Sequence, residues 1–176
     1  PLPSGDALGT GYLDVRRTKA DWDRTAADAG KINTYRNHNT HWWDGSQLYG
    51  SSKTQNDKVR SFVDGKLKIN ANGTLPTELL NGKPVTGFNE NWWVGLSMLH
   101  QIFTKEHNAI ATRLKQAYPT ASDQWLYDKS RLVTSALMAK IHTVEWTPAV
   151  IANPVTERAM YANWWGLIGN AQGRDK

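Results

Sequence analysis

The chain has 176 residues, of which 21 are Lys or Arg and 16 are Asp or Glu, so its formal net charge at neutral pH is +5. Hydrophobic residues make up 39% and charged residues 21%, a balance typical of a globular protein rather than a disordered one. Because the chain contains no cysteine, disulfide frameworks, thiolate zinc sites, iron–sulfur clusters and cysteine nucleophiles are excluded.

The distribution of charge and hydropathy sets two further expectations. The basic residues are spread along the chain instead of forming the stripe typical of nucleic-acid binding, so no nucleic-acid partner is expected. No apolar run approaches the ~20 residues of a membrane-spanning helix. We therefore expect a soluble or peripheral membrane protein without a transmembrane segment.

The first half of the chain is predicted to contain little regular structure. Residues 1–30 form an irregular arm, in which 18–29 are expected to make a short helix that ends at Gly30. Residues 31–60 are largely polar and contain the segment HWWDGSQLYG at 41–50. Residues 61–90 contain short runs separated by pairs that favour the positive φ angles of tight hairpins, so they are predicted to form a small β-meander: Asp64-Gly65, Asn72-Gly73 and Asn81-Gly82.

The second half, residues 91–170, is predicted to be a helical core of three helices. In the first helix, apolar residues recur at helical spacing and share one face: Leu96, Leu99, Phe103, Ile110 and Leu114. This helix ends at Tyr118-Pro119. The second helix starts at Ser122 or Asp123, continues to Thr147-Pro148 and carries its own stripe: Leu126, Val133, Leu137 and Val144. The third runs from Asn153-Pro154 to Gly169. The predicted fold class is therefore mainly α, and we expect residues 1–176 to form a single segment.

Two histidines of the first helix, His100 and His107, lie seven residues apart, about 10.5 Å along the axis. That separation is too large for both to hold one metal ion. We expect buried histidines that are satisfied by hydrogen bonds around Glu106 and Asn108. An axial haem ligand is the alternative.

His142 lies about 160° around the second helix from Leu126, on a side shared with Arg131, Ser135 and Trp146. Such a face can back a pocket or form a wet surface, and the residues alone leave both open. Thr147 is about 140° further round an ideal helix. Both side chains could therefore address one ligand only if Pro148 distorts the turn.

Thr40, Trp42, Asp44 and Ser46 alternate, so in an extended segment their side chains share a side. Two hydroxyls and a carboxylate are hard oxygen donors that suit calcium. The alternative is a simple turn in which Asp44-Gly45-Ser46 bonds its own backbone. The tryptophan doublets, Trp42-Trp43 among them, could stack on sugars or bases, although tryptophans are more often core residues.

Three stretches of the sequence together resemble a known family: HWWDGSQLYGSS at 41–52, NWWVGLSMLHQIFTKEHNAIATRL at 91–114 and RLVTSALMAKIHTVEW at 131–146. They are similar to the peroxidase–cyclooxygenase superfamily of haem proteins (animal haem peroxidases), and within it to the fatty-acid α-dioxygenases. FVDGKLKI at 62–69 and ANWWGLIG at 162–169 also resemble that branch. The likeness covers most of residues 31–169.

The resemblance implies a segment of a haem-peroxidase-like helical core that works with haem b and Ca2+. In this branch, peroxide-oxidised haem generates a tyrosyl radical, which removes a hydrogen beside a fatty acid's carboxylate, and O2 adds there to give a 2-hydroperoxy fatty acid. The family's calcium loop corresponds to Thr40, the carbonyl of Trp42, Asp44 and Ser46, and this match favours calcium over the simple turn. Its carboxylate clamp corresponds to His142 and Thr147.

The departures from the family pattern are equally specific. The distal haem histidine belongs to a His-Asp motif, which does not occur in this sequence, and its aspartate completes the metal site. A Tyr-x-x-His pattern at 35–38 precedes the calcium loop, whereas the family's follows the clamp. A clamp arginine further on has no counterpart. We therefore expect a central segment whose haem ligands and radical tyrosine lie outside it, which is inactive alone and works with the remaining segments of the enzyme.

Residues 84–94 contain Glu90 but lack the arginine that the resemblance places there in secreted mammalian peroxidases, which favours fatty-acid oxygenation. A general haem peroxidase that oxidises small substrates with peroxide is the first alternative. A non-catalytic segment that acts only in binding or assembly is the second.

Overall fold

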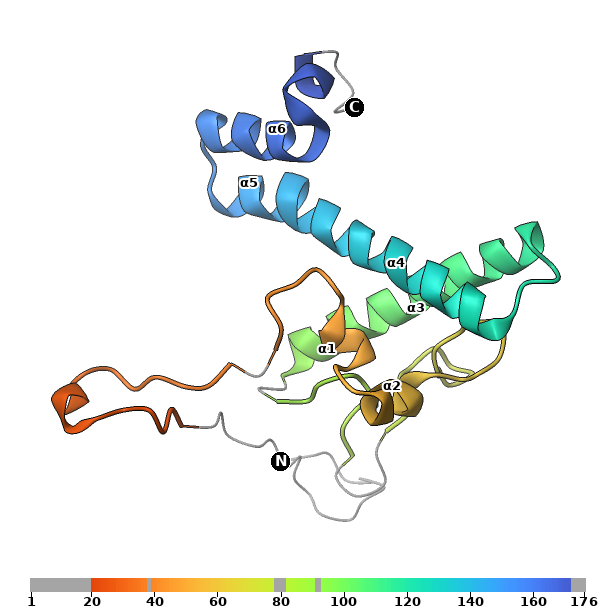
Figure 1. Ribbon diagram of the computed structural model, residues 1–176, viewed down its shortest axis with the longest axis horizontal. Helices are drawn as coiled ribbons and strands as arrows, with labels where there is room; N and C mark the ends of the chain where they lie inside the picture. Colours follow the sequence, from red (N-terminus) through yellow and green to blue (C-terminus); the bar gives the residue numbers. More distant parts are fainter. Residues whose placement is uncertain (1–19, 38, 78–81, 91–92, 172–176) are drawn as a thin grey trace.

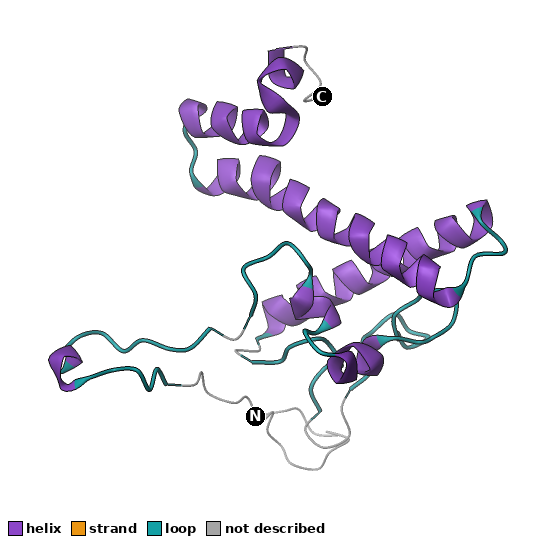
Figure 2. Cartoon of the chain, viewed as in Figure 1, coloured by secondary structure: helices purple, strands orange, loops and turns teal. Residues whose placement is uncertain are grey.

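The computed structural model describes residues 20–37, 39–77, 82–90 and 93–171, and these residues are mainly helical, as the sequence predicts (Figure 2). The helical elements, in chain order, are η1 (Ala26–Asp28), α1 (Ser46–Tyr49), α2 (Lys53–Val59), α3 (Val94–Ala117), α4 (Asp123–Ile141), η2 (His142–Trp146), α5 (Thr147–Val150) and α6 (Pro154–Ala171). The two long helices, α3 and α4, cross near the turn that joins them and diverge toward the start of α3 and the end of α4 (Figure 1).

Helix α3 ends at Ala117, directly before Tyr118-Pro119, as predicted. Its buried residues, however, form a more polar stripe than the sequence pattern indicates: His100, Thr104, His107, Ile110 and Ala111. Of the predicted apolar face only Ile110 is buried, and Leu99 is 50% exposed. Phe103 packs partly against the buried core, and the first residues of this face border a cavity, described below.

Helix α4 begins where Ser122 acts as N-cap, its hydroxyl accepting a hydrogen bond from the backbone N–H of Trp125 at 3.2 Å. Small polar residues dominate its buried face, and Val133, expected on the apolar stripe, is 47% exposed. The buried Thr134 hydroxyl donates to the carbonyl of Ser130 at 2.8 Å. This bond lets the hydroxyl be buried without an unpaired donor.

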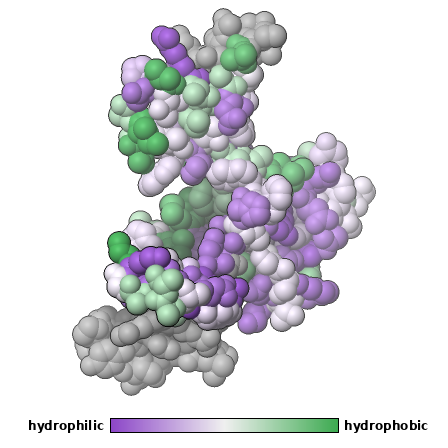
Figure 3. Space-filling view, turned by 60° about the vertical axis from the view of Figure 1, so that its left-hand side comes forward, coloured by the Kyte–Doolittle hydropathy of each residue, from purple (hydrophilic) through white to green (hydrophobic). Residues whose placement is uncertain are grey.

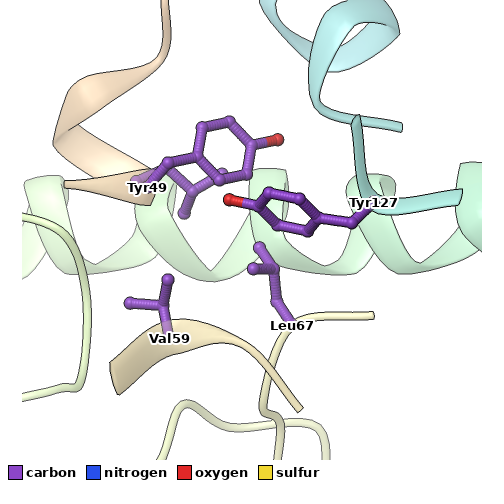
Figure 4. Close-up of a cluster of buried hydrophobic side chains, with 5 residues drawn as sticks. Tyr49, Val59, Leu67 and Tyr127 are labelled. Atoms are coloured by element: carbon purple, nitrogen blue, oxygen red, sulfur yellow. The ribbon is translucent and has the colours of Figure 1, made fainter. Parts of the chain in front are cut away.

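The buried core joins α1, α2, α4 and the 61–90 segment, and in the close-up view its tyrosine rings lie in front of α3 (Figure 4). The rings of Tyr49 and Tyr127 meet edge to face with centroids 6.0 Å apart, and Val59 and Leu67 pack beneath them. Arg60 closes this core: its guanidinium donates to the carboxylate of Asp123 at 2.7 Å and lies 4.1 Å from the centre of the Tyr127 ring.

The predicted β-meander over 61–90 does not form strands within the described part of that range. Two isolated antiparallel bridges, Arg60↔Leu67 and Thr77↔Pro84, occur instead. The backbone groups that a partner strand would bond are taken by side chains of the helices. The Asn108 amide accepts from the N–H of Leu67 at 2.8 Å and donates to its carbonyl at 3.0 Å, and Asp123 accepts from the N–H of Gly65.

Of the helix expected at 18–29, only the single 3-10 turn η1 is present, and residues 18 and 19 lie outside the described residues. The arm over 20–37 folds back on itself through one bridge, Ala20↔Tyr35. At the other end of the chain, α6 starts at Pro154 as predicted, but it bends at Gly166, whose φ of +76° breaks the helical backbone. In the described residues, no helix combines the length and apolarity needed to cross a membrane.

Candidate functional site

The open end between α3 and α4 holds a cavity of about 510 Å3, and the loop over 40–46 covers one side of it. Its walls are mostly apolar, and they include Leu96, Leu99, Phe103, Met138 and Ile141. The space-filling view shows apolar colour gathered in the recess between the upper and lower parts of the molecule (Figure 3). A cavity of this size and lining suits an apolar chain.

Ser135, His142 and Trp146 all line this cavity. The sequence left open whether their side of α4 backs a pocket or faces bulk water. In the structure, this side of the helix forms part of the wall of a pocket. Arg131, expected on the same side, instead lines a neighbouring polar hollow together with Thr40 and Asp44.

The backbone of His142 is linked to Thr147 by η2, a π-helical turn. In this turn the backbone N–H of Thr147 donates to the carbonyl of His142, five residues back. The Thr147 hydroxyl donates to the same carbonyl at 2.7 Å. Pro148 follows directly and has no N–H to offer the carbonyl of Val144, so a regular α-helix cannot continue through this point. The helix is thus distorted at this point, as the sequence indicates, and the His142 side chain lines the cavity, whereas Thr147 is not among the residues that line it.

Trp43 reaches from the 40–46 loop to the same place. Its ring lies 4.9 Å from that of His142, measured between centroids, at an interplanar angle of 55°. The His142 imidazole makes no hydrogen bond to any described residue and is exposed. Trp43 is 55% exposed, so both rings stand at the mouth of the cavity. Sequence reasoning missed this contact, because nothing in the spacing of residues 43 and 142 signals it.

Three of the four predicted cation ligands converge. The Thr40 hydroxyl donates to the Asp44 carboxylate at 3.1 Å and lies 3.4 Å from the Ser46 hydroxyl, and the N–H of Ser46 donates to the same carboxylate at 3.0 Å. The last bond is the one that a simple turn also predicts. Gly45 is required here, since at its φ of +62° a Cβ atom would stand 2.9 Å from the Tyr49 ring. The fourth predicted ligand is the backbone carbonyl of Trp42, whose side chain is exposed.

The loop carries little net charge. Burial alone would raise the pKa of Asp44, but the hydrogen bonds from Ser46 and Thr40, with the nearby Arg131 charge, hold that pKa below its ordinary value. The Arg131 guanidinium also donates to the Asp44 carbonyl at 3.3 Å. No group of three or more His, Asp or Glu side chains gathers at one point anywhere in the described ranges.

The two helix histidines have different surroundings. His107 is fully buried: its Nε2 donates to the carbonyl of Gly65 at 2.8 Å, so its Nδ1 must accept the hydrogen bond from the Tyr49 hydroxyl at 2.9 Å. A satisfied buried histidine is confirmed there, although its partners differ from the expected neighbours. His100 is 5% exposed, lines the cavity, and has no partner for either nitrogen among the described residues. Burial lowers the pKa of each histidine to about 4.

The chain is similar to plant enzymes over most of its length. It is 43% identical to rice "Alpha-dioxygenase PIOX" over 145 residues, which are 82% of this chain and 23% of the rice protein. Against the tobacco protein of that name it is 46% identical over 140 residues, 80% of this chain and 21% of the relative. The chain thus spans between a fifth and a quarter of the length of these relatives.

Solved structures agree with this likeness. The Arabidopsis thaliana fatty acid alpha-dioxygenase superposes with a TM-score of 0.73 at 42% identity, covering 78% of this chain and 21% of the other. A rice alpha-dioxygenase variant crystallised with palmitic acid gives 0.71 at 44% identity, covering 74% and 21%. The family profile described as animal haem peroxidase matches residues 1–176. The chain belongs to the animal haem peroxidase family.

Proposed function

We propose that this chain is part of a haem-dependent fatty-acid α-dioxygenase, an enzyme that combines a fatty acid with O2 to give a 2-hydroperoxy fatty acid. Within that enzyme the chain supplies the site for the acid end of the substrate. The observation that carries the proposal is the π turn, which bonds Thr147 to the carbonyl of His142, together with the apolar cavity that the His142 side chain lines. The likeness to relatives named for this activity, one of them crystallised with palmitic acid, supports it.

The hydrogen bonds of Thr147 suit a group that releases and binds a ligand. Its hydroxyl donates to the carbonyl of His142, but the backbone N–H of Thr147 donates to that carbonyl too. The hydroxyl can therefore rotate toward a carboxylate while the carbonyl remains paired. The exposed imidazole of His142 offers a second donor. Two donors on one carboxylate fix its orientation, and thereby fix which carbon is presented for oxidation.

The apolar cavity is the proposed place for the acyl chain. A chain of CH2 groups gains about 0.8 kcal/mol for each group removed from water. The walls provided by α3 and α4, with Phe103 and Met138 among them, can supply that burial. The polar end then lies at the exposed mouth, where His142 stands, and the hydrocarbon lies inside.

The loop over 40–46 is the proposed calcium site, with the Thr40 hydroxyl, the Trp42 carbonyl, the Asp44 carboxylate and the Ser46 hydroxyl as ligands. The convergence of three oxygen-bearing side chains fits a hard cation. One carboxylate beside the Arg131 guanidinium is too little negative charge for tight binding. We therefore expect the second carboxylate of the site to come from outside the described residues.

The described residues do not fit a complete haem site. His107 uses both ring nitrogens, and His41 and His142 are exposed. His100 is buried with free nitrogens, but the lining of its cavity contains no Lys or Arg to meet haem propionates. We therefore expect the haem ligands and the radical tyrosine in other segments of the enzyme. None of the steps with peroxide and O2 is assigned to residues of this chain.

The test is product analysis on the purified, haem-loaded protein that contains these residues. Given palmitate, 18O2 and trace peroxide, it is expected to form 2-hydroperoxypalmitate with both hydroperoxide oxygens from 18O2. Thr147→Val should lower kcat/KM about 10-fold or more, since a hydrogen bond to a charged group is worth about 1.5–3 kcal/mol. Thr120→Val, in the exposed turn after α3, is the matched control. Oxidation of small phenols without oxygenation of palmitate would instead support the general peroxidase.

A further inference from the structure

Trp43 joins two sites that the proposed function treats separately. In sequence it lies among the proposed calcium ligands, between Trp42 and Asp44. In space its ring packs against His142, half of the proposed carboxylate pair, with the centroids 4.9 Å apart. Within the described residues, no other ring contact to His142 is found, and His142 forms no hydrogen bond through its imidazole. Trp43 therefore provides the one ring contact in the described residues that can position the imidazole.

The position of Trp43 depends in turn on the cluster of oxygen atoms. In the described chain, no backbone–backbone hydrogen bond holds residues 40–44. The bonds that shape this stretch are those from the hydroxyl of Thr40 and the N–H of Ser46 to the Asp44 carboxylate, with one more from the Arg131 guanidinium to the Asp44 carbonyl. Beyond Asp44 the chain is fixed, because Ser46 is fully buried at the start of α1. The loop is thus anchored at one end and by Arg131 at Asp44, and its remaining bonds run through the groups that a cation would bind.

We propose that Trp43 couples the two sites, so that a calcium ion bound by the loop strengthens binding of a fatty acid's carboxylate at His142 and Thr147. The ion ties Thr40, Asp44 and Ser46 together and favours the loop shape in which Trp43 packs on His142. The imidazole is then held in place before the ligand arrives. Thermodynamic linkage makes the effect reciprocal, so the fatty acid strengthens calcium binding by the same factor.

The size of the coupling follows from the contact that transmits it. An aromatic pair of this geometry changes an equilibrium by a factor of about 2 to 12. Calcium can therefore tighten palmitate binding by at most about that factor through Trp43. This inference rests on the proposed function, because it takes the calcium loop and the carboxylate pair from it.

The experiment measures palmitate affinity in the haem-loaded protein without O2 or peroxide, by calorimetry, with calcium and with calcium chelated. Wild type is expected to bind palmitate about 2- to 12-fold more tightly with calcium. Trp43→Leu should lose this difference, and Trp43→Phe, which keeps a ring, should keep part of it. Trp125→Leu is the matched control: it removes a comparable aromatic contact, 5.1 Å from Tyr118, at the far end of α4.

A second readout is independent of turnover and of affinity. In protein labelled with 15N-histidine, calcium is expected to shift the ring signals of His142 in wild type and to leave them unchanged in Trp43→Leu. Equal calcium dependence in wild type and Trp43→Leu would overturn the coupling through Trp43. Calcium binding without any effect on wild-type palmitate affinity would also overturn it, while leaving the proposed function intact. Absence of calcium binding, or unchanged palmitate affinity in His142→Ala, would remove the proposed sites and the coupling with them.

Discussion

The hydrogen bond between Tyr49 and His107 is the most sharply testable feature of the core. Tyr49 is fully buried, and its hydroxyl donates to Nδ1 of His107 at 2.9 Å. Tyr49→Phe keeps the ring and its edge-to-face contact with Tyr127 but deletes the donor. Since Nε2 of His107 is committed to the Gly65 carbonyl, Nδ1 has no described donor to replace the lost one.

The expected cost of Tyr49→Phe is about 1–3 kcal/mol in the free energy of unfolding, the penalty for leaving one buried acceptor without a donor. Urea denaturation followed by tryptophan fluorescence measures it, provided that the slope of the transition is unchanged. Tyr35→Phe is the matched control: Tyr35 is 56% exposed, so its change is expected within about 0.5 kcal/mol. Equal stability of the two variants would refute the reasoning, because it would show that His107 Nδ1 finds another partner or needs none.

Three further predictions concern buried charge and protonation. Burial lowers the pKa of His107 and of His100 from 6.5 to about 4 in the folded state, so between these pH values the unfolded chain binds more protons than the folded chain. The free energy of unfolding is therefore highest above pH 6.5. It should fall by about 2 kcal/mol per histidine between pH 7 and pH 5, measured by urea titration. His100→Leu removes two unpaired nitrogens from an apolar wall, so it should raise stability at pH 7 by about 1 kcal/mol or more and reduce the acid loss measured in the same titrations. Asp123→Asn leaves the buried Arg60 guanidinium without its counter-charge and should cost about 2–3 kcal/mol in the same assay, less than a fully buried pair because Asp123 is 29% exposed, whereas Asp57→Asn in the exposed pair with Lys53 should cost little.

The sequence predicts the helices well where local chemistry decides. Ser122 supplies a cap that bonds the first turn of α4, Pro119 ends α3, and Pro154 opens α6. The oxygen donors of residues 40–46 are also predicted, because a short loop keeps them near one another whatever the rest of the fold does. Their meeting depends on spacing along one segment.

Features that depend on distant partners were not predictable in the same way. The turn pairs of residues 61–90 indicate hairpins, but Asn108, on a helix more than 40 residues away, takes both backbone groups of Leu67. The spacing of Leu96, Leu99 and Phe103 predicts a shared apolar face, but it does not show that a cavity lies against that face. In both cases the local pattern is present. What lies against it, a helix side chain in the first case and a cavity in the second, depends on distant parts of the chain that the pattern does not specify.

The His142 and Thr147 pair shows how a local signal and a distant contact combine. Pro148 has no N–H and cannot form one of the hydrogen bonds of an α-helix, so the sequence indicates an irregular turn at this point. The structure has a π turn there. The π turn bonds Thr147 to the carbonyl of His142 but does not orient the exposed imidazole. The ring of Trp43 contributes that contact from nearly one hundred residues earlier in the chain. A site of this kind is therefore sensitive to changes in the 40–46 loop as well as to changes in the helix that carries it.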